Sequence, residues 1–291
     1  MFVQFFLALL APALAGSSPD IHMRNSEGQQ VLNQILTDSS FWQGASRKQY
    51  QGRSYDEIRL KDTDSGYVPM ISGEGAQDFD NAVVADVVYK RNTDLPKYMS
   101  GAKVVIPLGS GYDSTVGADY RDSYYILDLT AFYGHFPQRM YRRFDETEQQ
   151  WVMWFEKLGP GFVDAATWSK YQAKMTSAVE GLDKRWLLNA VVEVTDIYGM
   201  FLVEPGEEHR SRVTFISKVT FGQGSGFIAR VGSQMPGVLK AGLKSGFSAS
   251  VAIAAHETTR RKPAPPAPVV PAPAPVVVPP AAPAPAAPPP Q

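Results

Sequence analysis

The sequence predicts an α+β fold in which an antiparallel sheet is closed over by a long C-terminal helix. Residues 211–221 alternate apolar and polar side chains, which is the period of a half-buried strand. After a glycine turn at 222–226 the apolar spacing changes to three and four residues, as in an amphipathic helix. The apolar positions are Val213, Phe215, Val219 and Phe221 in the strand, and Phe227, Ile228, Val231, Met235, Val238, Leu239, Leu243 and Phe247 in the helix. Such a helix needs a broad apolar surface, and the strands predicted upstream supply one.

Composition limits the classes of protein and partner. The chain has 291 residues, of which 44% are hydrophobic and 20% charged. This length suffices for one sizeable hydrophobic core even when the two ends of the chain are set aside. Its formal net charge is -1 and it carries no basic stripe interleaved with aromatics, so we expect no nucleic-acid partner. Cysteine is absent, which excludes disulfides, thiolate metal sites and a cysteine nucleophile.

The N-terminus has the pattern of a secretory signal peptide. An apolar run closes on Ala13-Leu14-Ala15 before Gly16, the small-x-small pattern of a cleavage site. We therefore expect residues 1–15 to be a signal peptide and the protein to be exported, to the periplasm, the cell surface or the extracellular space. An uncleaved apolar anchor or a buried helix is the alternative. Residues 16–66 are then an N-terminal extension.

The C-terminus has a different composition. Residues 258–291 comprise a basic junction at Arg260-Arg261-Lys262 and a tail that contains only Pro, Ala, Val and a final Gln. Proline removes backbone donors and fixes φ, so this tract favours extended polyproline II segments without a packed core and is expected to be disordered. We interpret it as an inert spacer, with a docking ligand or an envelope-spanning spacer as alternatives. The last option implies association with an envelope or membrane surface.

The first predicted elements are helical. Residues 26–40 have Val31, Leu32, Ile35 and Leu36 on one face, with Ser26 as the cap. The polar segment 43–65 receives no assignment. A strand at 67–72 with a turn or bulge at 73–75 follows, and then a helix at 78–90 that ends ahead of Leu95-Pro96, because the residue before proline avoids the helical region.

Strand signals dominate the middle of the chain. Aromatic and β-branched residues suit a pleated surface, and glycine or proline clusters separate the segments that are rich in them. They predict strands at 102–108, 123–133, 139–145, 150–158, 185–195 and 198–203, turns at 109–111, 134–137 and 159–161, and a helix at 165–182. Strands, an intervening helix and a long final helix together make an α+β fold.

This order resembles the START and polyketide-cyclase superfamily, also called the helix-grip or SRPBCC fold. The segment 82–105, AVVADVVYKRNTDLPKYMSGAKVV, is similar to the family's early helix, its Tyr- and Pro-containing turn and the strand that follows. Arg121-Asp122 is similar to the Arg-Asp at the start of a strand in START proteins, and 199–243 looks like the closing strand pair, glycine turn and gripping helix. The resemblance covers residues 67–255 in element order, and we assign 67–257 to the START-like domain. The insertion at 159–183 and the N-terminal extension depart from it.

The resemblance implies a curved sheet wrapped around the last helix, with an apolar cavity for a lipid, sterol or polyketide-like molecule. The candidates for its lining are Met99, Arg121, Tyr124, Trp151, Met153, Phe155, Trp186, Phe201, Phe215, Phe227, Met235, Leu239 and Leu243, with Asn189 as a further polar group. The alternative is that these side chains fill an ordinary core. Glycines at 232, 237, 242 and 246 each cost roughly 1 kcal/mol relative to Ala inside a helix, which suggests that the helix makes a close approach, bends or forms a movable lid over a cavity. The alternative is a pair of shorter helices broken near Met235-Pro236-Gly237.

Catalytic patterns are scarce. None of the four histidines is spaced from another histidine as metal ligands are, and the glycine loop at 222–226 lacks the Gly-x-Gly-x-x-Gly spacing, so we expect neither a metal nor a cofactor. His135 is expected in a turn, as a structural or solvated residue. We favour a non-enzymatic carrier or sensor of a hydrophobic ligand. The alternatives are a cyclase or hydrolase, with His135, Tyr125 or Asp122 as the acid-base group, and a cell-surface structural or adhesion module.

Overall fold

The computed structural model describes ten segments, namely residues 21–37, 46–50, 53–59, 69–74, 81–90, 94–99, 101–128, 133–182, 191–205 and 211–221. The chain divides into two units, 1–260 and 261–291, and every described residue belongs to the first. The predicted signal peptide, the long C-terminal helix and the proline-rich tail lie outside the described residues.

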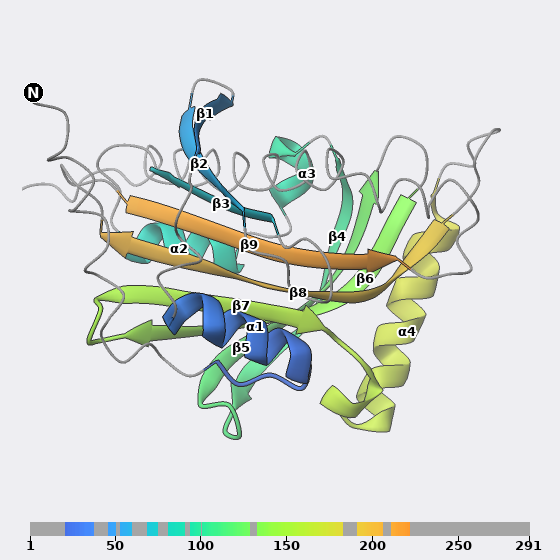
Figure 1. Ribbon diagram of the computed structural model, residues 1–291. Coiled ribbons are helices and arrows are strands. Elements are labelled where there is room, and N and C mark those ends of the chain that lie inside the picture. The colour runs from blue at the N-terminus through green and yellow to red at the C-terminus, as the bar shows by residue number, and fades with distance from the viewer. Residues whose placement is uncertain are drawn as a thin grey trace, which may run out of the picture. The chain divides into compact units, whose positions relative to one another are not determined.

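The α+β class and the antiparallel sheet are confirmed. Within the described residues, nine strands form one curved sheet in the order β1-β2-β3-β9-β8-β7-β6-β5-β4. Figure 1 shows β4, β5 and the first part of β6 steeply inclined to β7–β9. Neighbours in this order pair antiparallel. The strands are β1 (Ser46–Tyr50), β2 (Arg53–Arg59), β3 (Pro69–Glu74), β4 (Ala102–Asp113), β5 (Ala118–Asp128), β6 (Tyr133–Asp145), β7 (Gln150–Lys157), β8 (Val191–Pro205) and β9 (Ser211–Phe221).

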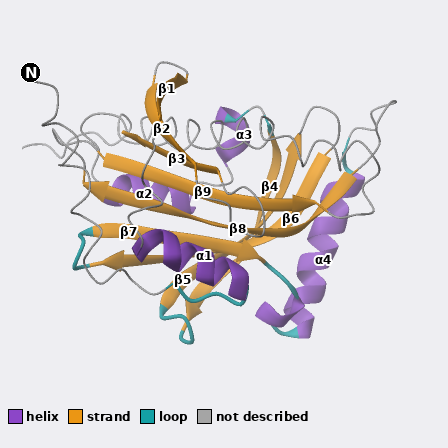
Figure 2. Ribbon diagram, in the orientation of Figure 1, coloured by secondary structure: helices purple, strands orange, loops and turns teal. Residues whose placement is uncertain are grey.

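Four α-helices and a short 3-10 helix accompany the sheet (Figure 2). They are α1 (Ser26–Thr37), α2 (Asn81–Lys90), α3 (Leu95–Tyr98), η4 (Pro160–Phe162) and α4 (Ala165–Glu180). The helices predicted at 26–40, 78–90 and 165–182 are therefore confirmed over their described residues, with residues 38–40 and 78–80 outside them and α4 ending at Glu180. The cap of α1 is Asn25 and not Ser26, because the Asn25 side-chain oxygen accepts a hydrogen bond from the Gly28 amide at 2.9 Å.

Because adjacent residues of a strand point to opposite faces, the sheet separates two apolar layers. On β7, Val152 and Trp154 point to the face that α1 covers, whereas Met153 and Phe155 point to the face that α2 covers. We call these the α1 face and the α2 face. Figure 1 shows α1 in front of β7 and β8, with α2 behind the sheet. Helix α4 packs on the β4–β6 part of the α1 face.

Several predicted boundaries are wrong for identifiable reasons. Residues 134–137, predicted as a turn, belong to β6. Since β7 ends at Lys157, the start of β8 can pair in parallel with the start of β6, and His135 lies opposite Glu193. The turn predicted at 109–111 is also strand, since Gly109 gives room to Tyr171. A Cβ at that position would lie 2.1 Å from the tyrosine hydroxyl.

The remaining differences concern the length and number of strands. The strand predicted at 123–133 ends at Asp128, and the two strands predicted at 185–195 and 198–203 form the single strand β8, with residues 185–190 outside the described segments. The polar segment 43–65, which received no assignment, contains β1 and β2. The predicted bulge region at 73–75 begins inside β3.

Gly199 is a position where the packing of the sheet depends on the absence of a side chain. A Cβ there would lie 2.1 Å from the Ile216 carbonyl oxygen and 2.4 Å from the Phe155 ring. We expect Gly199→Ala to lower the free energy of unfolding by about 1–3 kcal/mol, because backbone and ring must both shift. Urea denaturation measures it. Gly159→Ala is the matched control, since a Cβ there meets nothing within 4 Å. Equal stability of the two variants would contradict this packing.

Candidate functional site

Three phenylalanines form a cluster on the α2 face, which we call the phenylalanine cluster. Phe201 of β8 is paired with Phe215 of β9, and their rings stack with centroids 4.1 Å apart and planes at 3°. The Phe155 ring lies 6.1 Å from Phe201 and 6.3 Å from Phe215. Phe215 is only partly buried, so the cluster presents aromatic surface in addition to filling the core.

The predicted cavity residues separate into distinct places. Five of them meet in the core of the α2 face: Trp151, Met153, Phe155, Phe201 and Phe215. Met99 is the C-cap residue of α3, whose Leu95 and Tyr98 pack against the same core. Tyr124 points to the opposite face. The others, Trp186, Phe227, Met235, Leu239 and Leu243, lie outside the described residues, as does Asn189.

Arg121 joins β5 to the end of α2. Its Nη1 donates hydrogen bonds to the carbonyl oxygens of Lys90 at 2.6 Å and Tyr89 at 3.4 Å. A cation is favourable at this end of a helix, because the last carbonyls carry partial negative charge. The described contacts of Arg121 therefore hold the C-terminal end of α2 against β5.

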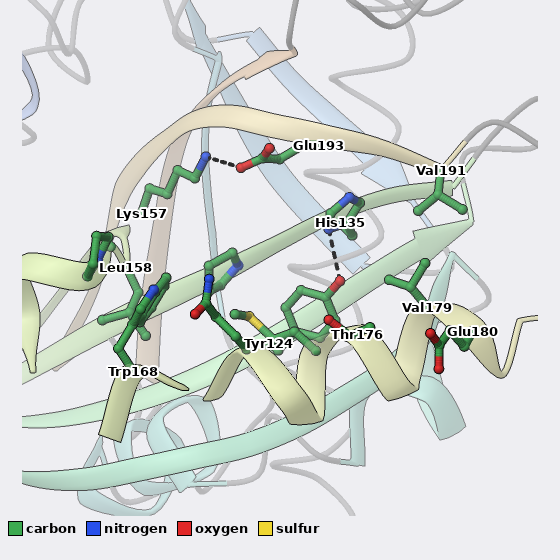
Figure 3. Close-up of a pocket in the computed structure, with 15 residues that line it drawn as sticks. Tyr124, His135, Lys157, Leu158, Trp168, Thr176, Val179, Glu180, Val191 and Glu193 are labelled. Atoms are coloured by element: carbon green, nitrogen blue, oxygen red, sulfur yellow. Dashed lines mark hydrogen bonds and ion pairs between the residues drawn. The ribbon is translucent and has the colours of Figure 1, made fainter. Parts of the chain in front are cut away.

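A pocket, which we call the α4 pocket, lies on the α1 face between α4 and strands β5–β8 (Figure 3). Its volume is about 540 Å³. It is lined by Tyr124, His135, Pro137, Lys157, Leu158, Gly159, Pro160, Trp168, Gln172, Met175, Thr176, Val179, Glu180, Val191 and Glu193. The sequence does not indicate this pocket, because its lining residues come from six elements that only the fold brings together.

Two polar contacts lie in the α4 pocket. The Tyr124 hydroxyl is 2.9 Å from His135 Nδ1, and Lys157 Nζ is 2.7 Å from Glu193 Oε1 (Figure 3). His135 belongs to β6, so its predicted place in a turn is wrong. The signal that could have revealed the first contact is the hairpin register. Ile126 pairs with His135 and Tyr124 with Pro137, which makes Tyr124 and His135 diagonal neighbours on one face.

Burial determines the protonation of the Tyr124–His135 pair. It lowers the pKa of His135, against a smaller opposite effect of Glu193, and it raises the pKa of Tyr124. At neutral pH the imidazole is therefore neutral and the phenol protonated. In the tautomer that carries its proton on Nε2, the hydroxyl donates to Nδ1, whereas in the other tautomer Nδ1–H donates to the hydroxyl oxygen.

Helix α4 covers its part of the sheet incompletely. Of its 16 residues only Tyr171 is buried, while Trp168, Met175 and Val179 are half-buried along the pocket. Its N-terminus is fixed, because the Asp164 side chain accepts a hydrogen bond from the Thr167 amide at 2.9 Å. Beyond Tyr171, the apolar side of the helix packs against the core only in part, and Met175 and Val179 also line the pocket.

A buried ion pair lies beneath the first half of α4. Arg139 donates from Nε to Asp122 Oδ1 at 2.7 Å and from Nη2 to Oδ2 at 2.8 Å, and their side chains are 3% and 0% exposed. Tyr171 donates to the same Oδ2 at 3.4 Å. Burial opposes the charge of Arg139, but its bonds to Asp122 outweigh that effect and raise its pKa. Burial also raises the pKa of Asp122, against the lowering effect of its bonds to Arg139, and the bidentate contact with Arg139 connects β5 and β6 to α4 through Tyr171.

The three acid-base candidates named from the sequence do not converge. Asp122 has both oxygens occupied by Arg139. Tyr125 is buried on the α2 face and stacks on Phe136 with ring centroids 5.2 Å apart. His135 lies on the α1 face with Tyr124. Within the described segments, no cluster of three or more His, Asp or Glu side chains could hold a metal ion, and no helix is long and apolar enough to cross a membrane.

The buried pair leads to a stability prediction. Asp122→Asn leaves the Arg139 guanidinium buried without its bidentate partner, so the free energy of unfolding should fall by about 3–5 kcal/mol in urea denaturation. Asp119→Asn is the matched control. Asp119 pairs with Arg142 at 3.4 Å, and the Asp119 side chain is 53% exposed. Such surface pairs contribute at most about 1 kcal/mol to the free energy of unfolding. A loss below that size in Asp122→Asn would refute the structural role.

Comparisons with known proteins find solved structures that are similar to this chain. No family profile and no curated protein matches the chain. Similar solved structures include human STARD10, with a TM-score of 0.48 and 11% identity over 85% of this chain and 87% of that chain. A STAR-related lipid transfer protein from Xanthomonas axonopodis has 0.45 and 11%, over 73% and 98%. The Zhui aromatase/cyclase from Streptomyces sp. R1128 has 0.39 and 12%, over 67% and 95%. Identities this low do not transfer a function.

Proposed function

We propose that the protein is an exported, non-enzymatic binder of a hydrophobic small molecule that is lipid-, sterol- or polyketide-like. The phenylalanine cluster is the observation that carries the proposal. Three aromatic rings from three adjacent strands share one face, and the half-buried Tyr98 and Trp151 lie against the same core. The sequence resemblance to START proteins supports the same function, and the small-x-small pattern before Gly16 supports export.

The energetics of such a site follow from apolar area. A ligand that removes about 100 Å² of apolar surface from water gains roughly 2.5 kcal/mol, before the cost of its immobilisation. The neighbouring charges do not compete with it, since Arg142 and Asp86 are paired at 2.7 Å. Specificity would then depend on the shape of the apolar surface and on few polar groups.

Lipid extraction of the purified full chain, followed by mass spectrometry, tests the proposal. We expect copurifying hydrophobic molecules, and we expect Phe215→Gln to reduce their amount about tenfold or more, which corresponds to roughly 1.4 kcal/mol. Tyr112→Gln is the control, because Tyr112 is 64% exposed at the end of β4.

Three outcomes would contradict the proposal. They are a chain that purifies without any extractable molecule and binds no added fatty acid, a bound molecule that is turned over, and equal retention by the Phe215→Gln and Tyr112→Gln variants. The first outcome favours a structural or adhesion module, and the second favours an enzyme. Circular dichroism of both variants establishes that they are folded.

A further inference from the structure

The α4 pocket is separate from the proposed hydrophobic site. It lies on the opposite face of the sheet from the phenylalanine cluster, and its volume of about 540 Å³ is within the roughly 300–1,000 Å³ of small-molecule sites. A molecule in one site would therefore not contact the other. The nature of its occupant follows from its walls and its charges.

The walls of the pocket are apolar on two opposite sides. Trp168, Met175 and Val179 contribute from α4, at a spacing of seven and four residues that places them on one side of the helix. Leu158 and Val191 contribute from the sheet side (Figure 3). The three helix residues are only half-buried. A flat apolar molecule between these walls would remove that surface from water.

The polar groups restrict the charge of the occupant. His135 Nδ1 lies 2.9 Å from the Tyr124 hydroxyl, and in the tautomer in which Tyr124 donates, Nε2 carries the proton and is a hydrogen-bond donor. Lys157 brings one positive charge, whereas Glu193 and Glu180 bring two negative charges. Lys157 is already paired with Glu193, so the described lining residues offer no excess positive charge with which to hold an anion.

We propose that the α4 pocket binds a neutral, flat aromatic or alicyclic molecule, with an oxygen that accepts a hydrogen bond from His135 Nε2–H. The ring system lies between the α4 residues and the sheet, and the oxygen lies toward His135. An anionic molecule with the same ring system binds more weakly, because it meets Glu193 and Glu180 without a free cation. This site goes beyond the proposed carrier function and requires no chemistry.

Naphthol and naphthoate form a matched pair of probes, since they share a ring system and differ in charge at neutral pH. Isothermal titration of the full chain should show saturable binding of naphthol, with naphthoate at least tenfold weaker. Histidine nitrogen NMR should show Nε2 of His135 protonated, with a shift on addition of naphthol. His135→Phe should weaken naphthol binding about three- to tenfold, the effect of one lost hydrogen bond.

Two variants of α4 test the pocket without changing His135, whose substitution could disturb folding. Thr176→Trp fills the pocket from an exposed position of α4, and we expect it to abolish naphthol binding. Ser177→Trp adds the same side chain at an exposed position that does not line the pocket, and it should bind naphthol normally. Absent naphthol binding, equal or tighter binding of naphthoate, or unchanged binding by Thr176→Trp would each overturn the proposal. Lipid retention by Thr176→Trp should remain that of the unmodified chain.

Discussion

The two-residue period of the strands is the constraint on which the rest of the structure depends. Along β7, Val152 and Trp154 contribute to the layer under α1, whereas Met153 and Phe155 contribute to the opposite layer. The alternation thus gives the sheet two apolar faces with different contents. The α2 face concentrates stacked phenylalanines, while the α1 face carries buried polar pairs and a pocket.

The α4 pocket arises from the way in which α4 is attached. The ion pair between Asp122 and Arg139, together with Tyr171, fixes the first half of the helix to β5 and β6. Gly109 allows this close approach, since any side chain there would overlap the Tyr171 hydroxyl. Beyond Tyr171 the helix has no buried residue, because β7 has ended and β8 pairs directly with β6. The polar anchor thus determines where the cavity opens.

The elements that the sequence predicts well are those whose pattern is local. Helices α1 and α2 follow from apolar periodicity, β7 from its aromatic and β-branched residues, and β9 from alternation. Strands β1 and β2 escaped assignment because their polar composition resembles a loop. The strand residues at 109–111 and 134–137 were mistaken for turns because glycine and proline there serve tertiary contacts. Phe155, Phe201 and Phe215 are candidates that the sequence names one by one, and the pairing of β7, β8 and β9 brings them together. The Tyr124–His135 pair depends on a register that no single segment reveals.

The central claim is that a hydrophobic molecule lies against the α2 face. Photo-crosslinking of the full chain with a diazirine-labelled fatty acid, followed by peptide mapping, tests it most directly. The account predicts labelled residues on β7, β8 and β9 at α2-face positions, including Phe201 or Phe215, and competition by unlabelled fatty acid. Labelling confined to α4 and the α1 face, or labelling that unlabelled fatty acid does not reduce, would contradict it.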